Sequence, residues 1–257
     1  MSLKKLFVLF LKKIEIGSAV AVRLTKYTGR SQVFIHPKHF LSQTPWYTKY
    51  LKRSDVVLDL GSGNGQSSIK ASRFAKKVVG LEINKELIKI AKKSAEIKKL
   101  KNVTFLESDL EGKLNIKNNS FDKAIFLDVL EHLIKRDQIL REIKRILKPR
   151  GVLFLGVPNS QTSWKKFQRS AGINSFSDPD HKIEFNEEEI KDLLKKHNFK
   201  IEKIFYGAID TPFRSFFDII GAFSIPLYKK ISTWRIKKSQ KNHKEAGGFE
   251  ILCTNQK

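Results

Sequence analysis

The sequence of 257 residues has a single cysteine, Cys253, and no long uninterrupted apolar run. One cysteine excludes an internal disulfide and a cysteine-rich metal site. The apolar run nearest the start, residues 6–11, is six residues long and ends at two lysines. It is too short for an export signal or a membrane-spanning helix, so we expect a cytoplasmic protein.

Acidic residues are also few: 26 stand against 50 lysines and arginines, which gives a net charge of +24. The imbalance is greatest in residues 1–54, where 11 basic residues face one acid. Such charge can attract RNA, anionic lipid or an acidic substrate. An abundance of lysine can also reflect genome bias or adaptation to heat, so the charge alone does not identify a partner.

The most informative stretch is the run from Val56 to Gly65, VVLDLGSGNG. It is typical of a buried strand that breaks into a glycine loop and opens a helix. Glycines at every second position let the backbone bend sharply and approach a ligand closely. Gln66 stands where a dinucleotide-binding motif has its third glycine, and the lysine of a phosphate-binding loop is absent. The loop therefore indicates a nucleotide cofactor of another kind.

The loop and the strands after it carry a resemblance to a known family. Residues 59–65 (DLGSGNG) closely resemble the first motif of class I S-adenosylmethionine-dependent methyltransferases, and the resemblance extends over residues 54–206. It implies an α/β fold with a doubly wound, mostly parallel seven-stranded sheet, Rossmann-like, with helical cap additions. Further strands are predicted at residues 77–82, 103–106, 121–128, 152–157, 199–206 and 249–254.

The same resemblance implies how S-adenosylmethionine is held. Glu82 ends the second strand, 17 residues after Gly65, where the family binds both ribose hydroxyls. Asp109 stands where the family has an acid facing the adenine amino group. The cofactor-binding residues implied in this way are Asp59, Gly61, Ser62, Gly63, Asn64, Gly65, Glu82, Ile83, Asp109, Leu110 and Asp128.

We expect the methyltransferase domain to span residues 52–257, after a basic amphipathic helical extension or lid at residues 1–51. Inserts at residues 158–185 and 208–248 should leave strands at the edge where ligands bind. The second insert holds four phenylalanines within eleven residues. They could roof an apolar acceptor pocket, enter an anionic membrane surface, or pack against the first helix.

His132 and His181 are the candidate catalytic bases, since methylation of a hydroxyl needs proton removal near neutral pH. Each could instead have a structural role. Together with Glu131 they could bind a divalent ion, as some ubiquinone-pathway relatives suggest by resemblance. Three scattered ligands are a weak signal, so no metal site is predicted.

Two motifs that are missing from the sequence narrow the choice of methyl acceptor. The fourth strand lacks the Asp/Asn-Pro-Pro-Phe/Tyr turn with which the family holds planar amines, and Cys253 is misplaced for pyrimidine carbon-5 methylation. Residues 181–190 resemble small-molecule O-methyltransferases, including those of ubiquinone biosynthesis. We therefore predict methylation of a hydroxyl on a small, apolar or lipid-like acceptor such as a quinone. RNA methylation is the second alternative, and a non-catalytic cofactor-binding scaffold is the third.

Overall fold

The computed structural model describes the chain except for residues 1, 16–17, 33 and 42–44, which all belong to the predicted N-terminal extension. The chain divides into two compact units. Residues 44–158, 180–205 and 249–257 form the first, which we call the sheet unit. Residues 1–43, 159–179 and 206–248 form the second, which we call the helical unit.

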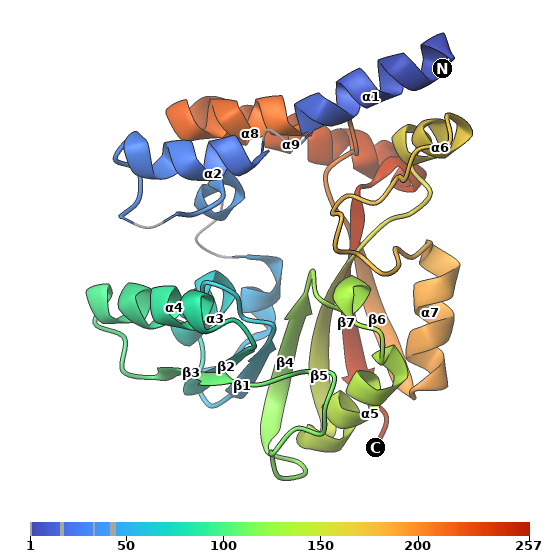
Figure 1. Ribbon diagram of the computed structural model, residues 1–257. Coiled ribbons are helices and arrows are strands. Elements are labelled where there is room, and N and C mark those ends of the chain that lie inside the picture. Colours follow the sequence, from blue (N-terminus) through green and yellow to red (C-terminus); the bar gives the residue numbers. More distant parts are fainter. Residues whose placement is uncertain (1, 16–17, 33, 42–44) are drawn as a thin grey trace. The chain divides into compact units, whose positions relative to one another are not determined.

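The sheet has seven strands in the order β3-β2-β1-β4-β5-β7-β6 and is mostly parallel with one antiparallel hairpin (Figure 1). This confirms the predicted fold class. Reversal of the strand order beside β1 opens a crevice at the strands' carboxyl ends, where ligands of such sheets bind. The strands are β1 (Val56–Leu60), β2 (Lys77–Glu82), β3 (Val103–Glu107), β4 (Phe121–Leu127), β5 (Leu147–Pro158), β6 (Phe199–Tyr206) and β7 (Gly248–Asn255).

The helices of the sheet unit form where apolar residues recur at helical spacing and where a polar side chain caps the first turn. Asn84 caps one helix by accepting from the amides of Glu86 and Leu87, and Asn186 opens another with a capping box. Beneath them, Val57, Ile125 and Phe154 belong to the buried core. The helical elements are η2 (Trp46–Tyr50), α3 (Gln66–Ser72), α4 (Lys85–Ile97), η3 (Leu130–His132), α5 (Arg136–Ile146) and α7 (Glu187–Lys196).

The strand predicted at residues 152–157 was placed too late. β5 already begins at Leu147, directly after α5, because Phe121 pairs with Leu147 before the register shifts toward Lys123. Arg150 adopts a left-handed φ of 60° within this strand. Residues 147–151, which precede the predicted strand, thus belong to β5.

The helical unit holds α1 (Leu3–Glu15) and α2 (Ser18–Tyr27) from the N-terminal region. Among the described residues, no helix is both long and apolar enough to cross a membrane. Val8 and Leu11 of α1 pack with Trp164 in a small apolar cluster. The remaining elements are η1 (Pro37–Phe40), α6 (Ser163–Ser170), α8 (Arg214–Phe223), α9 (Ile225–Lys241) and η4 (His243–Glu245).

Candidate cofactor and acceptor site

The loop between β1 and α3 turns on three glycines with positive φ: 71° at Gly61, 52° at Gly63 and 81° at Gly65. A Cβ atom at Gly61 would lie 2.5 Å from Val129 Cγ2, and one at Gly65 would lie 2.7 Å from the Phe105 ring. At Gly63, no described heavy atom lies within 4 Å of such a Cβ. Packing requires the outer two glycines, while the middle one borders open space that a ligand can enter.

Glu82 joins this loop to the end of β2. Its Oε2 accepts a hydrogen bond from the Gly63 amide at 2.9 Å, and its Oε1 accepts from the amides of Ile83 and Asn84, both at 2.9 Å. A carboxylate has about four acceptor positions, so one of them stays available to a ligand hydroxyl. Ile83, which follows, exposes most of its side chain. The structure thus brings Glu82 and Ile83 beside the loop, as the family pattern implies.

Asp59 lies almost fully buried in β1, and its Oδ2 accepts a hydrogen bond from Ser68 Oγ of α3 at 2.5 Å. Burial raises the pKa of Asp59 to about 6, while the hydrogen bonds from Ser68 oppose the shift and the nearby Glu82 adds to it. In this arrangement Asp59 ties β1 to α3. A direct contact between Asp59 and the cofactor remains a prediction.

Two buried polar atoms of the loop region, Ser62 Oγ and Gln66 Nε2, have no hydrogen-bond partner among the described residues. Buried polar groups are normally satisfied, so such atoms are natural contacts for a polar ligand. S-adenosylmethionine offers polar amino-acid and ribose groups, and its positive sulfonium suits the neighbouring carboxylates. The loop therefore fits this cofactor by its open glycine, its acids and its polar atoms.

The other predicted cofactor residues follow β3 and β4. Asp109 is exposed, and its Oδ1 accepts from the Glu111 amide at 2.8 Å, whereas Leu110 is buried. Asp128 is exposed with a left-handed φ of 56°, and its amide donates to the Gly156 carbonyl at 3.1 Å. Carboxyl ends of parallel strands lie on one edge of the sheet, so both acids belong to the edge that bears the glycine loop. Their contacts with the cofactor remain predictions.

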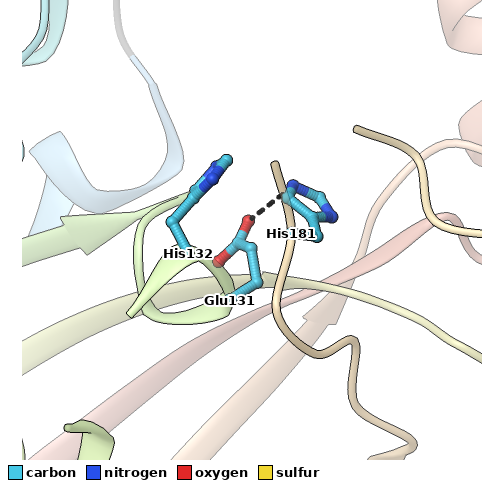
Figure 2. Close-up of side chains that lie close together, drawn as sticks. All are labelled: Glu131, His132 and His181. Atoms are coloured by element: carbon cyan, nitrogen blue, oxygen red, sulfur yellow. Dashed lines mark ion pairs between the residues drawn. The ribbon is translucent and has the colours of Figure 1, made fainter. Parts of the chain in front are cut away.

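Both predicted catalytic histidines lie together at this end of the sheet (Figure 2). η3, directly after β4, carries Glu131 and His132. The segment that carries His181 is held beside η3 because the amides of Lys182 and Ile183 donate to the Glu131 carbonyl at 2.8 and 3.3 Å. His181 consequently stands edge-on to His132 with ring centroids 4.6 Å apart, and its Nε2 lies 3.9 Å from Glu131 Oε1.

Glu184, which the sequence analysis did not single out, is a direct partner of His181. Its Oε1 lies 2.9 Å from His181 Nδ1, and the two side chains are 0% and 7% exposed. With Glu184 ionised, Nδ1 carries the proton and Nε2 is left as the basic nitrogen, as in other carboxylate–histidine pairs. The available signal was the spacing of three residues from His181, together with the position of an acid between two apolar residues, Ile183 and Phe185.

Glu131, His132 and His181 also offer one ligand atom each within 4.8 Å of one another. Two imidazoles and a carboxylate are a donor set that suits zinc and similar divalent ions, with Glu184 orienting His181 from behind. These residues therefore fit a divalent cation better than the sequence suggested. The prediction of no metal site is neither confirmed nor contradicted.

Comparison with known proteins places this chain in a family. A family model described as a methyltransferase domain matches residues 51–234. A ubiquinone/menaquinone biosynthesis C-methyltransferase of Blochmanniella pennsylvanica is 37% identical over 40% of this chain and 43% of its own length. A mitochondrial ubiquinone biosynthesis O-methyltransferase of Dictyostelium discoideum is 36% identical over 40% of this chain and 35% of its own length. The chain thus spans less than half of each of these relatives.

Solved structures show the same fold. A putative methyltransferase of Bacillus halodurans has a TM-score of 0.58 at 18% identity, covering 80% of this chain and 95% of its own. The cyclase SpnF has a TM-score of 0.58 at 20% identity, covering 90% of this chain and 80% of its own. Because a cyclase shares the fold, the architecture alone does not fix the reaction.

The chain belongs to the methyltransferase domain family, in the class of S-adenosylmethionine-dependent methyltransferases. S-adenosylmethionine is its cofactor.

Proposed function

We propose that this enzyme methylates a hydroxyl group of a small, apolar or lipid-like acceptor, with His181 as the general base. The observation that carries the proposal is the pairing of His181 Nδ1 with Glu184 Oε1 at 2.9 Å. S-adenosylmethionine supplies an electrophilic methyl group, whose bond to sulfur breaks as the bond to oxygen forms. A hydroxyl oxygen must lose its proton during this transfer, and the basic Nε2 of His181 can accept it.

The chain's own residues supply position as well as a base. His181 is fixed from one side by Glu184 and from the other by the backbone anchor on Glu131. Such preorganisation matters because the rate of an in-line methyl transfer depends mainly on holding the acceptor atom and the methyl group in the correct alignment. His132 contacts His181 edge-on and so belongs to the same site.

Similarity to relatives supports a quinone-like acceptor but leaves the methylated atom open. The relatives named above include both a C-methyltransferase and an O-methyltransferase of ubiquinone biosynthesis. A basic nitrogen oriented by a buried carboxylate suits the hydroxyl, whose oxygen must lose its proton as the methyl group is transferred, and analysis of the product distinguishes this reaction from methylation of a ring carbon.

The test uses a hydroquinone that bears one isoprenoid tail, incubated with the full chain and S-adenosylmethionine. We expect mass spectrometry to find the new methyl group on oxygen. His181→Ala should lower turnover by roughly 100-fold or more while leaving cofactor affinity nearly unchanged. Methyl transfer to a ring carbon, or full turnover of His181→Ala, would contradict the proposal.

A divalent cation at Glu131, His132 and His181 is an alternative way to activate the same hydroxyl, because a metal lowers the pKa of a bound oxygen group. Calorimetric titration of the chain with Zn²⁺ distinguishes the two. Tight binding that is lost in Glu131→Gln would favour the metal, whereas undiminished activity in a chelator supports His181 acting alone.

A further inference from the structure

α8 is packed with its small and polar residues inside and its large aromatic residues outside. Ser215, Asp218, Gly221 and Ala222 are buried. Gly221 is so closely packed that a Cβ atom there would lie 2.7 Å from Pro37 and 2.8 Å from Tyr228. By contrast, Phe216 and Phe223 of α8 are 57% and 58% exposed, Phe213 just before the helix is 49% exposed, and Phe217 is half-buried. This is the reverse of an ordinary amphipathic helix, in which large apolar side chains face the core.

The reversal is held in place by a polar cluster beneath α8. Asp218 accepts a hydrogen bond from the Tyr228 hydroxyl at 2.6 Å and lies 3.2 Å from His36 Nε2. Burial by itself raises the pKa of Asp218, but the interaction with His36 and the hydrogen bond from Tyr228 outweigh it and hold the pKa at about 2. A buried, ionised and hydrogen-bonded Asp218 fixes which face of the helix turns inward.

α1, which packs with α8 in the helical unit, shows a second outward apolar stripe. Val8 and Leu11 face the unit's own interior. On another face, the spacing of three and four residues brings together Leu3, Leu6, Phe7 and Phe10, all exposed. Phe10 alone exposes 61% of its side chain. α1 is thus apolar both where it packs and where it meets solvent, which is unusual for a surface helix.

α9 adds an aromatic residue among lysines. Trp234 is 53% exposed, and Lys238 Nζ lies 6.0 Å from the centre of its ring. Lys230 and Lys237 are exposed at spacings of four and three residues from Trp234, so they lie on the same side of the helix. Tryptophan flanked by lysines is typical of segments that lie at the boundary between lipid head groups and acyl chains.

We propose that these exposed faces of α1, α8 and α9 bind the surface of an anionic lipid bilayer. The aromatic and aliphatic side chains would enter the head-group region, and the lysines would contact lipid phosphates. Charge identifies this occupant: the helical unit carries 19 lysines and arginines against five acids. A second copy of the chain would bring the same positive charge to the interface, and an RNA would leave the phenylalanines without a function. Figure 1 shows α1, α8 and α9 together in the helical unit.

The experiment is co-sedimentation of the full chain with vesicles of pure phosphatidylcholine and of phosphatidylcholine mixed with phosphatidylglycerol. We expect binding to the anionic vesicles and little to the neutral ones. Phe10→Ser with Phe216→Ser should weaken binding by about tenfold or more, since it removes two inserting rings. Ile97→Ser with Ile134→Ser, which changes two exposed apolar residues of the sheet unit, is the matched control and should have no effect.

Charge reversal tests the lysines separately. Lys230→Glu, Lys237→Glu and Lys238→Glu combined should weaken binding by about 100-fold or more, since each lysine near an anionic surface contributes about fivefold. Lys92→Glu, Lys98→Glu and Lys101→Glu combined change the net charge equally on exposed positions of the sheet unit and should weaken binding far less. Retained S-adenosylmethionine affinity shows that each variant is folded, and it separates this result from the proposed reaction.

Three outcomes would overturn the proposal. The first is an equal loss in both lysine variants, which would mean that only net charge matters. The second is tight binding of a structured RNA with no vesicle binding. The third is a stable dimer in sedimentation velocity that Phe10→Ser with Phe216→Ser converts to a monomer, which would make a second copy the occupant.

Discussion

The sheet unit and the helical unit differ in which side chains of a helix are buried. α5 in the sheet unit buries Ile139, Leu140, Ile143 and Ile146, the apolar stripe of an ordinary amphipathic helix. α8 in the helical unit buries Ser215, Asp218, Gly221 and Ala222 while its large phenylalanines face outward. Packing therefore accounts for the side chains of α5, and the exposed residues of α8 need a function outside the fold to account for them.

Charge separates the two regions as well. The sheet edge that bears the glycine loop carries Asp59, Glu82, Asp109 and Asp128, although the chain as a whole has a net charge of +24. Such a local excess of acid suits a cofactor with a sulfonium and an ammonium group. The helical unit has the opposite excess. The net charge of the chain therefore has the sign of the helical unit and does not describe the acidic edge of the sheet.

The largest effect is expected at the acidic edge. Glu82→Ala should weaken S-adenosylmethionine binding by roughly 10-fold to 150-fold, because the one hydrogen bond that its remaining acceptor position can take from the cofactor contributes about 1.5–3 kcal/mol. Glu107→Ala removes an acid at the end of the neighbouring strand, where it pairs only with the exposed Lys85 in the sheet unit. Calorimetry should find its affinity unchanged, and an equal loss in both variants would mean that charge alone holds the cofactor.

The histidine pair should show a smaller but specific effect. Glu184→Gln keeps the size of the side chain but no longer fixes the proton on His181 Nδ1, so turnover should fall by about 10-fold to 100-fold with cofactor affinity kept. The acidic limb of the pH–rate profile, along which protonation of the base stops activity, should move to lower pH because the carboxylate that stabilises the protonated imidazole is gone. His197→Ala, which removes a histidine paired with Asp137, is the control and should retain activity. An unchanged profile in Glu184→Gln would remove His181 from the role of base.

Asp59 should make folding depend on pH. Its pKa is raised from 3.8 to about 6 in the fold, so the folded state binds the proton more tightly than the unfolded state. Its contribution to stability is present at low pH and is lost as pH rises through that window, by roughly 2–3 kcal/mol. Asp59→Asn should abolish this loss in urea unfolding at pH 4 and pH 7. A pH dependence identical to that of the original chain would contradict the assignment.

Asp218 should give a pH effect of the opposite sign and smaller size. Its pKa is lowered to about 2, so its stabilisation is present above the ordinary pKa near 4 and is lost as pH falls toward 2. Asp218→Asn should destabilise the helical unit by about 1–2 kcal/mol at pH 7 by weakening the bond from Tyr228. Tryptophan fluorescence during urea unfolding, with Trp46→Phe in both proteins so that only Trp164 and Trp234 of the helical unit report, measures this; an unchanged midpoint would show that the cluster does not fix α8.

The sequence predicted most of the sheet because its signals are local. Hydrophobic runs and the glycine loop mark β1, β2 and β4 to within a residue or two, and the family resemblance implied that they form a doubly wound, mostly parallel sheet. The early start of β5 was missed because Pro149 and Gly151 are typical helix-stop residues, whereas pairing of Leu147 with Phe121 decided the outcome.

The candidate site was predictable only in part. Glycines and acids that follow strands have a recognisable spacing, but the bond between His181 and Glu184 depends on a loop that is anchored through the Glu131 backbone carbonyl. No side-chain pattern encodes a contact made through a main-chain atom. The burial of Asp218 could not be predicted for a similar reason. Its partners His36 and Tyr228 lie outside α8, and hydrophobic periodicity does not predict contacts between polar side chains of different segments.

The most direct test of the division of work between the two units measures S-adenosylmethionine affinity and binding to anionic vesicles on the same two variants. Glu82→Ala should lose cofactor affinity and keep vesicle binding. Lys230→Glu, Lys237→Glu and Lys238→Glu combined should keep cofactor affinity and lose vesicle binding. Loss of both activities in either folded variant would contradict the account, because it would mean that one surface serves both ligands.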